Sequence, residues 1–312
     1  MEPQRFGIAV LGTGIMGRRM LAALQPHPRF RVVAAWDPDA AALQAALALA
    51  PGARAAASAE ALFDDAAVDV VYVASPPAAH AAAVRGALQA GKPCLCEKPL
   101  THDTAEAEAL RDAVLQAGLP FAVNFPFARS VAANRLREIV QGGELGRIGS
   151  AHIRLRFARW PRAWQAGASP WLAGPAEGGF TREVLSHFAF LALRVFGPFE
   201  VAEVALERAP GAAETALRAR WRHAGVAVHV DAAVAGELAD DNRFEVVGER
   251  GRVALVNWAQ LEHQGHTSER TDSTPRTLDG LAALLEGRPD HGLATIAEAA
   301  AVVRGIESML RG

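Results

Sequence analysis

The sequence predicts an α/β protein in two parts: a doubly wound parallel sheet, then an α/β domain with a large, mostly antiparallel sheet. Over roughly the first 120 residues, short apolar runs rich in valine alternate with helical segments, which is typical of a parallel sheet covered on both faces. Beyond that point apolar and polar residues alternate, as in residues 216–221, which indicates antiparallel strands with one wetter face. A chain of 312 residues also exceeds the usual size of a single core. We therefore expect one domain over residues 1–123 and a second over residues 124–312.

The first domain is expected to alternate strands with helices throughout. Gly91 and Gly118 each follow an expected helix, as glycines do at helix C-termini. The strands are expected at residues 8–11, 31–36, 68–74, 94–96 and 121–123, and the helices near residues 15–24, 39–50, 78–90 and 104–116.

The second domain is expected to begin with a helix near residues 129–141 that ends at Gly142-Gly143. Its strands are expected at residues 148–157, 199–207, 215–222, 226–234, 243–247 and 252–257, its other helices near residues 181–196, 276–286 and 293–311, and a polar loop at residues 264–275. If the exposed face of this sheet is as apolar as the alternation suggests, it would pair with another subunit, giving a homodimer or homotetramer.

Composition excludes several classes of protein. The formal net charge of −2 provides no basic field for nucleic acid or an anionic membrane surface. We expect neither a membrane span nor a secretory leader, because the long alanine tracts are interrupted by charges and the first apolar run is short. Cys94 and Cys96 alternate on one strand, a spacing that does not readily close a disulfide, and a zinc site would need more ligands nearby. We interpret them as buried apolar residues of a cytoplasmic protein and expect no metal.

Lysine is rare in this chain. Only two of its 32 lysine and arginine residues are lysines, Lys92 and Lys98. Lys98 directly follows an expected buried strand, and open α/β sheets place their active sites at the carboxyl ends of strands. An ammonium can exchange a proton where a guanidinium cannot. Lys98 is therefore a candidate catalytic residue, the alternative being a surface charge.

A glycine-rich turn links the first expected strand to the first helix. The segment Gly12-Thr13-Gly14-Ile15-Met16-Gly17 provides a tight turn, room for a pyrophosphate, and close contact between helix and strand. The free amides of the helix N-terminus would face the phosphates. This pattern predicts dinucleotide binding.

Asp37 ends the second expected strand, where a carboxylate can bind both hydroxyls of the adenosine ribose. Its negative charge would repel a 2′-phosphate, so we expect NAD as the cofactor. NADP is the alternative, because Arg18 and Arg19 lie nearby in the sequence and can offset that repulsion.

These residues resemble those of the Gfo/Idh/MocA oxidoreductases, the family of glucose–fructose oxidoreductase and inositol dehydrogenase. The resemblance is densest over residues 6–150 and extends more loosely through the whole chain. It lies in motifs with the family's order and spacing: Gly12–Gly17, Ser75-Pro76-x-x-x-His80, Ala90-Gly91-Lys92-Pro93, Glu97-Lys98-Pro99 and Gly142-x-x-x-Gly146-x-Ile148.

The resemblance implies a Rossmann domain, an α/β domain with an open-faced sheet, and a nicotinamide cofactor. It places Lys98 near the reacting carbon, where an ammonium stabilises a developing alkoxide. It places Glu97 against the nicotinamide ribose, and Ser75, Pro76 and His80 beside the nicotinamide. His80 is as readily interpreted as a helix residue that satisfies a backbone group. Pro77 stands where the family has asparagine.

A second catalytic motif of the family is Asp-x-x-x-His after a glycine pair. Here the segment after Gly178-Gly179 contains Glu183 and His187, which share a helix face because they are four residues apart. The resemblance implies that His187 relays the alcohol proton, while Glu183 orients it or binds substrate. Glu183 replaces the usual aspartate, and Leu185 replaces a glycine.

Substrate contacts are expected from three further places. Three tryptophans and two arginines within residues 157–171, Trp164 among them, form either a substrate wall or a loop pinned to the core. Arg182 either recognises a substrate acid or neutralises Glu183. Asn124 opens the second domain, where relatives place groups that face the cofactor.

These observations favour an NAD(P)-dependent oxidoreductase that interconverts a secondary alcohol and a ketone on a sugar, cyclitol or related polyol or sugar acid. Two alternatives keep the fold: an NAD-dependent glycosidase, and a redox-silent regulator that senses a dinucleotide or a sugar. Retention of both Lys98 and His187 argues against the regulator.

Overall fold

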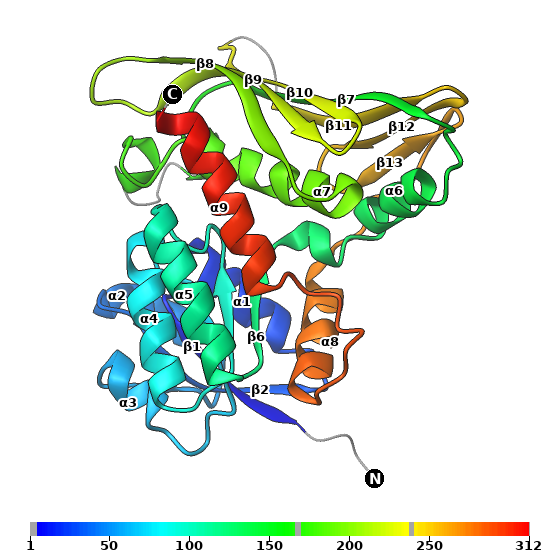
Figure 1. The fold of residues 1–312 in the computed structure, drawn as a ribbon. Coiled ribbons are helices and arrows are strands. Elements are labelled where there is room, and N and C mark those ends of the chain that lie inside the picture. Colours follow the sequence, from blue (N-terminus) through cyan, green and yellow to red (C-terminus); the bar gives the residue numbers. More distant parts are fainter. Residues whose placement is uncertain (1–4, 166–169, 237–239, 312) are drawn as a thin grey trace. The chain divides into compact units, whose positions relative to one another are not determined.

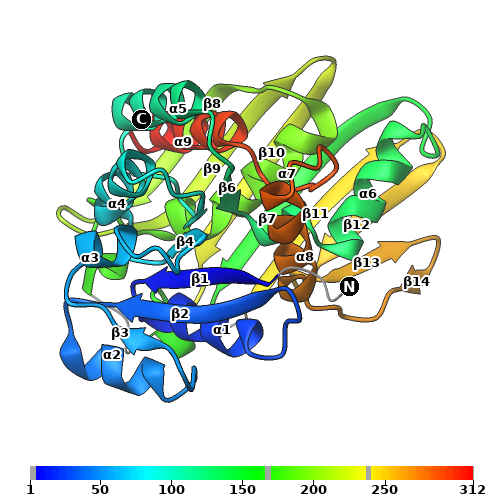
Figure 2. The same cartoon turned by 90° about the horizontal axis from the view of Figure 1, so that it is seen from below.

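A six-stranded parallel sheet forms the centre of the first part of the chain in the computed structural model, which describes residues 5–165, 170–236 and 240–311. The strand order is β3-β2-β1-β4-β5-β6. Strands β2 and β3 are added on one side of β1 and strands β4 to β6 on the other, as in a doubly wound fold. The strands are β1 (Phe6–Leu11), β2 (Phe30–Trp36), β3 (Arg54–Ala55), β4 (Val70–Val73), β5 (Cys94–Glu97) and β6 (Phe121–Asn124). The helices of this part are α1 (Ile15–Leu24), α2 (Ala40–Leu47), α3 (Ala59–Phe63), α4 (Pro77–Gln89), α5 (Thr104–Ala117) and α8 (Thr274–Leu285) (Figures 1 and 2).

The chain forms two compact units that are not continuous in sequence. Unit 1 comprises Met1–Pro126 and Thr274–Ala300, and unit 2 comprises Phe127–Ser273 and Ala301–Gly312. The change at Pro126 lies close to the boundary expected after residue 123. Residues 274–300, which were expected in the second domain, belong to unit 1.

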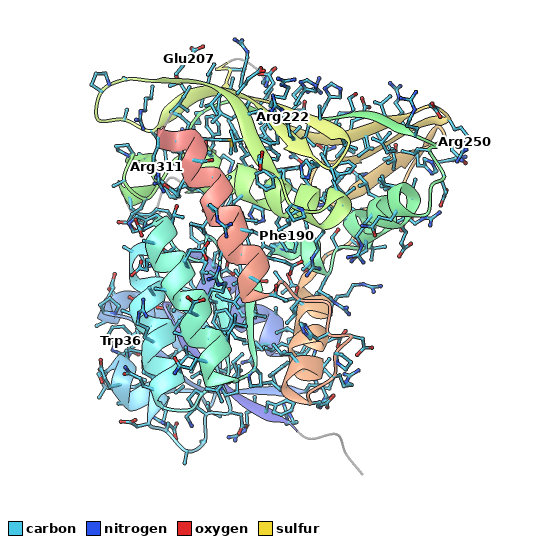
Figure 3. All side chains as sticks on the ribbon, in the orientation of Figure 1. Trp36, Phe190, Glu207, Arg222, Arg250 and Arg311 are labelled. Atoms are coloured by element: carbon cyan, nitrogen blue, oxygen red, sulfur yellow. The ribbon has the colours of Figure 1, made fainter. Side chains whose placement is uncertain are left out.

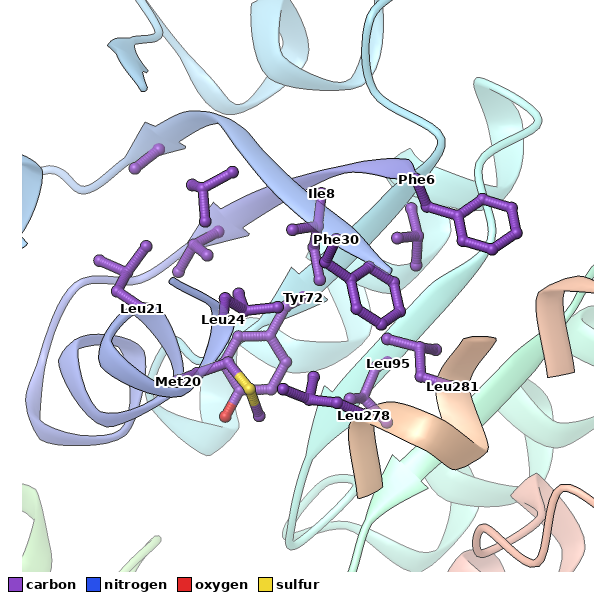
Figure 4. Packing of buried hydrophobic residues seen from close by; sticks show 14 of the residues in the cluster. Phe6, Ile8, Met20, Leu21, Leu24, Phe30, Tyr72, Leu95, Leu278 and Leu281 are labelled. Carbon is purple, nitrogen blue, oxygen red and sulfur yellow. The ribbon is translucent and has the colours of Figure 1, made fainter. Parts of the chain in front are cut away.

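The physical reason for this assignment is a shared apolar core. Leu278 and Leu281 are almost completely buried and pack in one cluster with Phe6 and Phe30 of the parallel sheet (Figure 4). Leu293 is buried in the same cluster. In addition, the amide of Val123 donates a hydrogen bond to the carbonyl of Ala294 at 2.9 Å. The expected alternation of strand and helix could not reveal this returning segment, because its apolar residues fit a helix of either domain.

An eight-stranded sheet forms unit 2, in the order β14-β13-β12-β11-β7-β10-β9-β8. Among the described strands of this sheet only β7 and β10 pair in parallel, so the sheet is mostly antiparallel, as predicted. Helices α6 and α7 cover one face (Figure 1). The elements of this unit are α6 (Val131–Gln141), β7 (Ile148–Phe157), α7 (Ser186–Phe196), β8 (Glu200–Arg208), β9 (Glu214–His223), β10 (Val226–Val234), β11 (Asp241–Gly248), β12 (Gly251–Val256), β13 (Gln260–His263) and β14 (His266–Thr267), and α9 (Ile296–Arg311) belongs to both units.

The outer face of this sheet is charged, whereas the sequence analysis allowed for an apolar face. Alternate residues of β7 show the reason, since Ala151, Ile153 and Leu155 are buried and the residues between them are polar and more exposed. Glu207 and Arg222 lie on β8 and β9 among the many charged side chains of the sheet (Figure 3). On this face the ion pairs Arg156–Asp231, Arg154–Asp241 and Arg220–Glu203 join neighbouring strands. A fourth ion pair, Arg243–Glu262, joins β11 to β13 across β12. Within the described ranges, no helix is long and apolar enough to cross a membrane.

Candidate active site

The glycine-rich turn of unit 1 lies between β1 and α1, as predicted. Gly12 has a φ of +93°, and a Cβ there would lie 2.5 Å from the backbone of Ala74 and Ser75. A Cβ on Gly17 would lie 2.0 Å from the Gly12 carbonyl oxygen, so helix and strand touch through glycine. Around Gly14, by contrast, the space is open. Glycine thus closes the turn at both ends and leaves its middle accessible.

Helix α1 begins at Ile15-Met16 with Gly14 as its N-cap, and no side chain among the described residues caps it. Its first amides therefore remain available to an anion, and the helix dipole favours negative charge there. The turn thus has both the space and the donors that a pyrophosphate requires.

Asp37 lies at the end of β2, and its carboxylate is fixed by the glycine-rich turn. One oxygen accepts hydrogen bonds from the amide and hydroxyl of Thr13, at 2.6 and 3.0 Å, and the other accepts from the amide of Asp39 at 2.9 Å. The Arg18 guanidinium donates to the Thr13 carbonyl at 3.1 Å. A carboxylate held at this position can accept ribose hydroxyls, and the ribose contact of Asp37 stays a prediction.

Glu97 ends β5 in a buried hydrogen-bonded network. Its carboxylate accepts a hydrogen bond from the Tyr72 hydroxyl and another from the Asn124 amide at 2.7 Å. Burial raises the pKa of Glu97, while these donors lower it. Lys98 follows with a side chain that is 9% exposed. Residues at the ends of β4, β5 and β6 thus meet at the Glu97 carboxylate. Asn124 was expected to contact substrate, and its side-chain amide donates a hydrogen bond to Glu97.

His80 links two loops at the carboxyl ends of the strands. Its Nδ1 lies 2.9 Å from the Pro99 carbonyl oxygen and its Nε2 lies 2.8 Å from that of Ser75. The ring is 1% exposed, and burial lowers its pKa. Of the two interpretations of His80, this geometry favours the one in which a helix residue satisfies backbone groups. The Ser75 hydroxyl is buried and, among the described residues, has no hydrogen-bond partner.

In unit 2, the segment that carries Glu183 and His187 begins as a π-helical turn, Thr181–Leu185, which continues into α7. The amide of Ser186 reaches back five residues to the Thr181 carbonyl. Such widened turns occur frequently at functional sites. His187 is 6% exposed, and its ring packs edge-on against Phe127 and Trp258, with centroids 5.9 and 5.2 Å apart.

The glycine pair before this turn makes room for a buried carboxylate. Gly179 has a φ of +93°, and a Cβ there would lie 2.3 Å from Glu214 Oε2. Glu214 Oε1 accepts a hydrogen bond from the Thr181 amide at 2.6 Å. Glu214 therefore fixes the start of the turn, a role that no sequence motif predicts.

Arg182 does not have the geometry of a substrate contact. Its guanidinium forms a bidentate ion pair with Glu307, at 2.6 and 2.8 Å, and also donates to the carbonyls of Pro175 and Gly178. Both charged side chains are more than nine-tenths buried. Arg182 was expected to bind a substrate acid or to neutralise Glu183. Its partner is Glu307, which is distant in sequence.

The tryptophan-rich loop contains one exposed ring and one pinned ring. Trp164 is 44% exposed, and its place in a substrate wall stays a prediction. The Trp160 indole instead donates to the Leu172 carbonyl at 2.9 Å and packs edge-on against Phe157 and Phe180. Trp258, which no motif singled out, completes this aromatic group beside His187.

The residues of unit 1 fit a nicotinamide dinucleotide. The open space at Gly14, the uncapped amides of α1, the fixed Asp37 carboxylate and the unsatisfied Ser75 hydroxyl provide a cradle, donors and acceptors for such a cofactor. These features are those of a dinucleotide-binding domain, joined in one chain to a second unit with a mostly antiparallel sheet.

Comparison with known proteins identifies the class. Residues 6–125 match the family model GFO_IDH_MocA, described as an oxidoreductase family with an NAD-binding Rossmann fold. Residues 133–254 match the model of the GFO/IDH/MocA C-terminal domain. The chain belongs to the Gfo/Idh/MocA family of NAD-dependent oxidoreductases, and the predicted family, fold class and cofactor are thereby confirmed.

Among curated relatives, inositol 2-dehydrogenase 2 of Saccharopolyspora erythraea is 30% identical over 285 residues, covering 90% of this chain and 77% of that protein. The inositol 2-dehydrogenase of Corynebacterium glutamicum is 34% identical over 143 residues, or 45% of this chain and 42% of its own length.

Two solved structures share the fold. GenD2 from gentamicin A biosynthesis, in complex with NAD, has a TM-score of 0.84 at 23% identity and covers all of this chain and 95% of its own. The WlbA dehydrogenase from Bordetella pertussis, in complex with NADH and UDP-GlcNAcA, has a TM-score of 0.85 at 20% identity, with coverages of 99% and 97%.

Proposed function

We propose that this oxidoreductase interconverts a secondary alcohol and a ketone on a sugar, a cyclitol or a related polyol or sugar acid. The observation that carries the proposal is the buried lysine Lys98 at the carboxyl end of β5, in a family with an NAD-binding Rossmann domain. The inositol 2-dehydrogenases among the relatives support a polyol substrate.

The proposed reaction moves one hydride and one proton. A nicotinamide dinucleotide held by the glycine-rich turn and Asp37 would supply the hydride chemistry, taking the hydride from the carbinol carbon or giving it to the ketone. The Lys98 ammonium donates a hydrogen bond to the substrate oxygen and stabilises its developing negative charge. His187 takes the hydroxyl proton, with Glu183 as the carboxylate that orients it or binds a substrate hydroxyl. Glu97 is held as an acceptor by Tyr72 and Asn124.

Substitution of Lys98 tests the proposal. Lys98→Met should lower kcat roughly 100- to 1000-fold, because it removes the donor to the developing oxyanion, while the Kd for NADH stays near that of the wild type. NADH formation from myo-inositol and a polyol panel measures the first quantity, and NADH fluorescence measures the second. Lys92→Met, which removes the other lysine, is the matched control. Unchanged turnover in Lys98→Met would refute the role.

Cofactor choice follows from Asp37. Its fixed carboxylate would repel a 2′-phosphate, so we propose that NADH binds more tightly than NADPH. Dissociation constants for the two cofactors test this, and a clear preference for NADPH overturns it.

We also propose a cytoplasmic homodimer or homotetramer. The two cysteines, Cys94 and Cys96, are buried and unpaired, which is consistent with a reducing compartment.

A further inference from the structure

The π-helical turn before α7 is an unusual backbone form, and its shape depends on the groups that hold it. The Ser186 amide donates to the Thr181 carbonyl, five residues back, whereas in an α-helix it would donate to the Arg182 carbonyl. Turns of this kind are rare and contain one residue more than an α-helical turn. The extra residue changes the direction of the side chains before it relative to those after it. The turn therefore sets where Glu183 lies relative to His187.

A serine hydroxyl bonds to the carbonyl that the widened turn deprives of its usual amide donor. The Ser186 Oγ donates to the Arg182 carbonyl at 2.6 Å and so takes the place of the Ser186 amide. Ser186 is 1% exposed, so water has little access to this carbonyl. One side chain thus stabilises the widened turn at the residue that directly precedes His187.

Arg182 ties the turn to two other segments of unit 2. Its Nε and Nη2 donate to the two carboxylate oxygens of Glu307, at 2.6 and 2.8 Å, in the part of α9 that belongs to unit 2. Its Nη1 donates to the carbonyls of Pro175 and Gly178, at 2.8 and 3.2 Å, in the loop before the turn. A planar guanidinium holds a carboxylate in a fixed orientation. These four hydrogen bonds fix the Arg182 side chain against both α9 and the loop.

The Arg182–Glu307 ion pair is an inefficient means of stabilising the fold alone. Both side chains are more than nine-tenths buried, so the loss of their hydration offsets much of their attraction. Apolar side chains of similar volume often stabilise a protein interior equally well. An apolar pair would not provide the fixed direction of the four hydrogen bonds, and this property suits a role in geometry.

We infer that the Arg182–Glu307 pair positions His187 by holding the π-helical turn in shape. This role rests on the proposed function, in which His187 takes the hydroxyl proton and Glu183 assists it. The two charged groups are bound to each other, so their effect on the reaction passes through the turn. Displacement of a catalytic group by about 1 Å can cost about 100-fold in rate, so loss of the pair should lower kcat.

The test removes both charges at once, so that no buried charge is left without a partner. Arg182→Met/Glu307→Met should keep a Tm close to that of the wild type. Its kcat per folded molecule, measured as NADH formation from myo-inositol and the polyol panel, should fall roughly 10- to 100-fold. The Kd for NADH should stay unchanged, because the cofactor residues belong to unit 1. The matched control, Arg147→Met/Glu249→Met, removes an exposed ion pair of unit 2 and should leave kcat unchanged.

NMR measures the position of His187 directly. The ring resonances are assigned by their absence in His187→Gln, and they respond to displacement because the ring packs edge-on against Phe127 and Trp258. They should shift in the double variant that lacks the buried pair and stay in place in the control. Ser186→Ala, which deletes only the hydroxyl bonded to the Arg182 carbonyl, should also shift them, and it serves if the double variant does not fold.

Unshifted His187 resonances, or an unchanged kcat per folded molecule, in a folded Arg182→Met/Glu307→Met protein would overturn the inference. If that protein does not fold, unshifted resonances in Ser186→Ala would do the same. A pair that only stabilises the fold would lower the Tm of the double variant and leave kcat per folded molecule intact. Failure of the proposed oxidoreduction would appear differently, as a wild type that forms NADH from no polyol while the His187 resonances still shift in the double variant.

Discussion

The side chains of Lys92 and Lys98 belong to one short segment around β5, yet their surroundings differ. The Lys92 ammonium donates to the carbonyls of Asp65 and Val68, at 2.9 and 2.8 Å, and so ties the loop before β4 to the start of β5. Lys98 lies at the other end of the strand, beside the Glu97 network. Both lysines attract attention because lysine is rare in this chain. The hydrogen bonds of the Lys92 ammonium to two backbone carbonyls indicate that Lys92 has a structural role.

Lys92→Met should therefore reduce stability and leave chemistry intact. The loss of two charge-assisted hydrogen bonds from a half-buried group should cost about 1–3 kcal/mol of unfolding free energy. Urea denaturation measures this cost, and kcat per folded molecule should equal that of the wild type. A large fall in kcat with unchanged stability would mean that Lys92 acts in the site.

Tyr72 is the only tyrosine of the chain, and its hydroxyl faces Glu97 inside the parallel sheet. Burial raises the pKa of Glu97, and the Tyr72 hydrogen bond opposes that effect. Tyr72→Phe should raise the pKa of Glu97 further. A raised carboxyl pKa in the folded state costs stability once pH exceeds the unfolded value of about 4.3, so the penalty is absent at lower pH and grows as pH rises through the folded pKa.

The stability deficit of Tyr72→Phe should thus be larger at pH 7 than near pH 4.5, by about 1–3 kcal/mol for the lost hydrogen bond to a carboxylate. Denaturation curves of the variant and the wild type across this range provide the measurement, and the acid point is the internal control. A stability deficit of Tyr72→Phe that is independent of pH would show that the Tyr72 hydroxyl does not stabilise the Glu97 carboxylate.

At the scale of elements, the turn before α7 illustrates how glycine prepares a site. Gly179→Ala should place a methyl group 2.3 Å from Glu214 Oε2 in a left-handed backbone position. The carboxylate would move away from the Thr181 amide, and strain alone should cost about 1–3 kcal/mol. We expect a lower Tm and a lower kcat, because the π-helical turn carrying Glu183 and His187 shifts. Gly174→Ala is the matched control, since its nearest neighbour would lie at 3.5 Å. Equal melting temperatures for the two variants would contradict this account.

The regular elements were predictable because their apolar periodicity is strong. Strands β1, β2, β4, β7 and β10 lie within a residue or two of their predicted positions. The short elements β3, α3, β13 and β14 were missed, because two to five residues carry no readable period. The positions of Lys98 and His187 on their elements also followed from motifs.

Contacts between residues that lie far apart in the sequence could not be predicted from the sequence. Glu214 under Gly179, Glu307 on Arg182 and Trp258 beside His187 each depend on pairings between separate elements. Asn257-Trp258 gave no signal either, because a left-handed tryptophan contradicts ordinary turn preferences. The residues that build the site's surroundings are thus the least predictable part of it.

For the molecule as a whole, the proposed homo-oligomer would pair through the outer face of the eight-stranded sheet, and the chemistry of that face sets how such pairing would respond to salt. An apolar face would associate through burial and would be little affected by moderate salt. The face observed here carries cross-strand ion pairs, with Asp231 close to both Arg156 and Arg218. Pairing through such a face depends on charge complementarity, which salt screens.

We therefore expect sedimentation velocity to show an oligomer at low ionic strength that shifts to smaller species as NaCl rises from about 0.1 to 1 M, over which the Debye length falls from about 10 to 3 Å. Asp231→Arg, which would gather three arginines on the face, should weaken association several-fold at low salt. Asp112→Arg on α5, where Asp112 pairs with Arg111, is the control and should leave it unchanged. A monomer under all conditions would end the proposal of a homo-oligomer. An oligomer that salt strengthens would locate the contact on an apolar surface elsewhere, because screening cannot stabilise an interface formed by ion pairs.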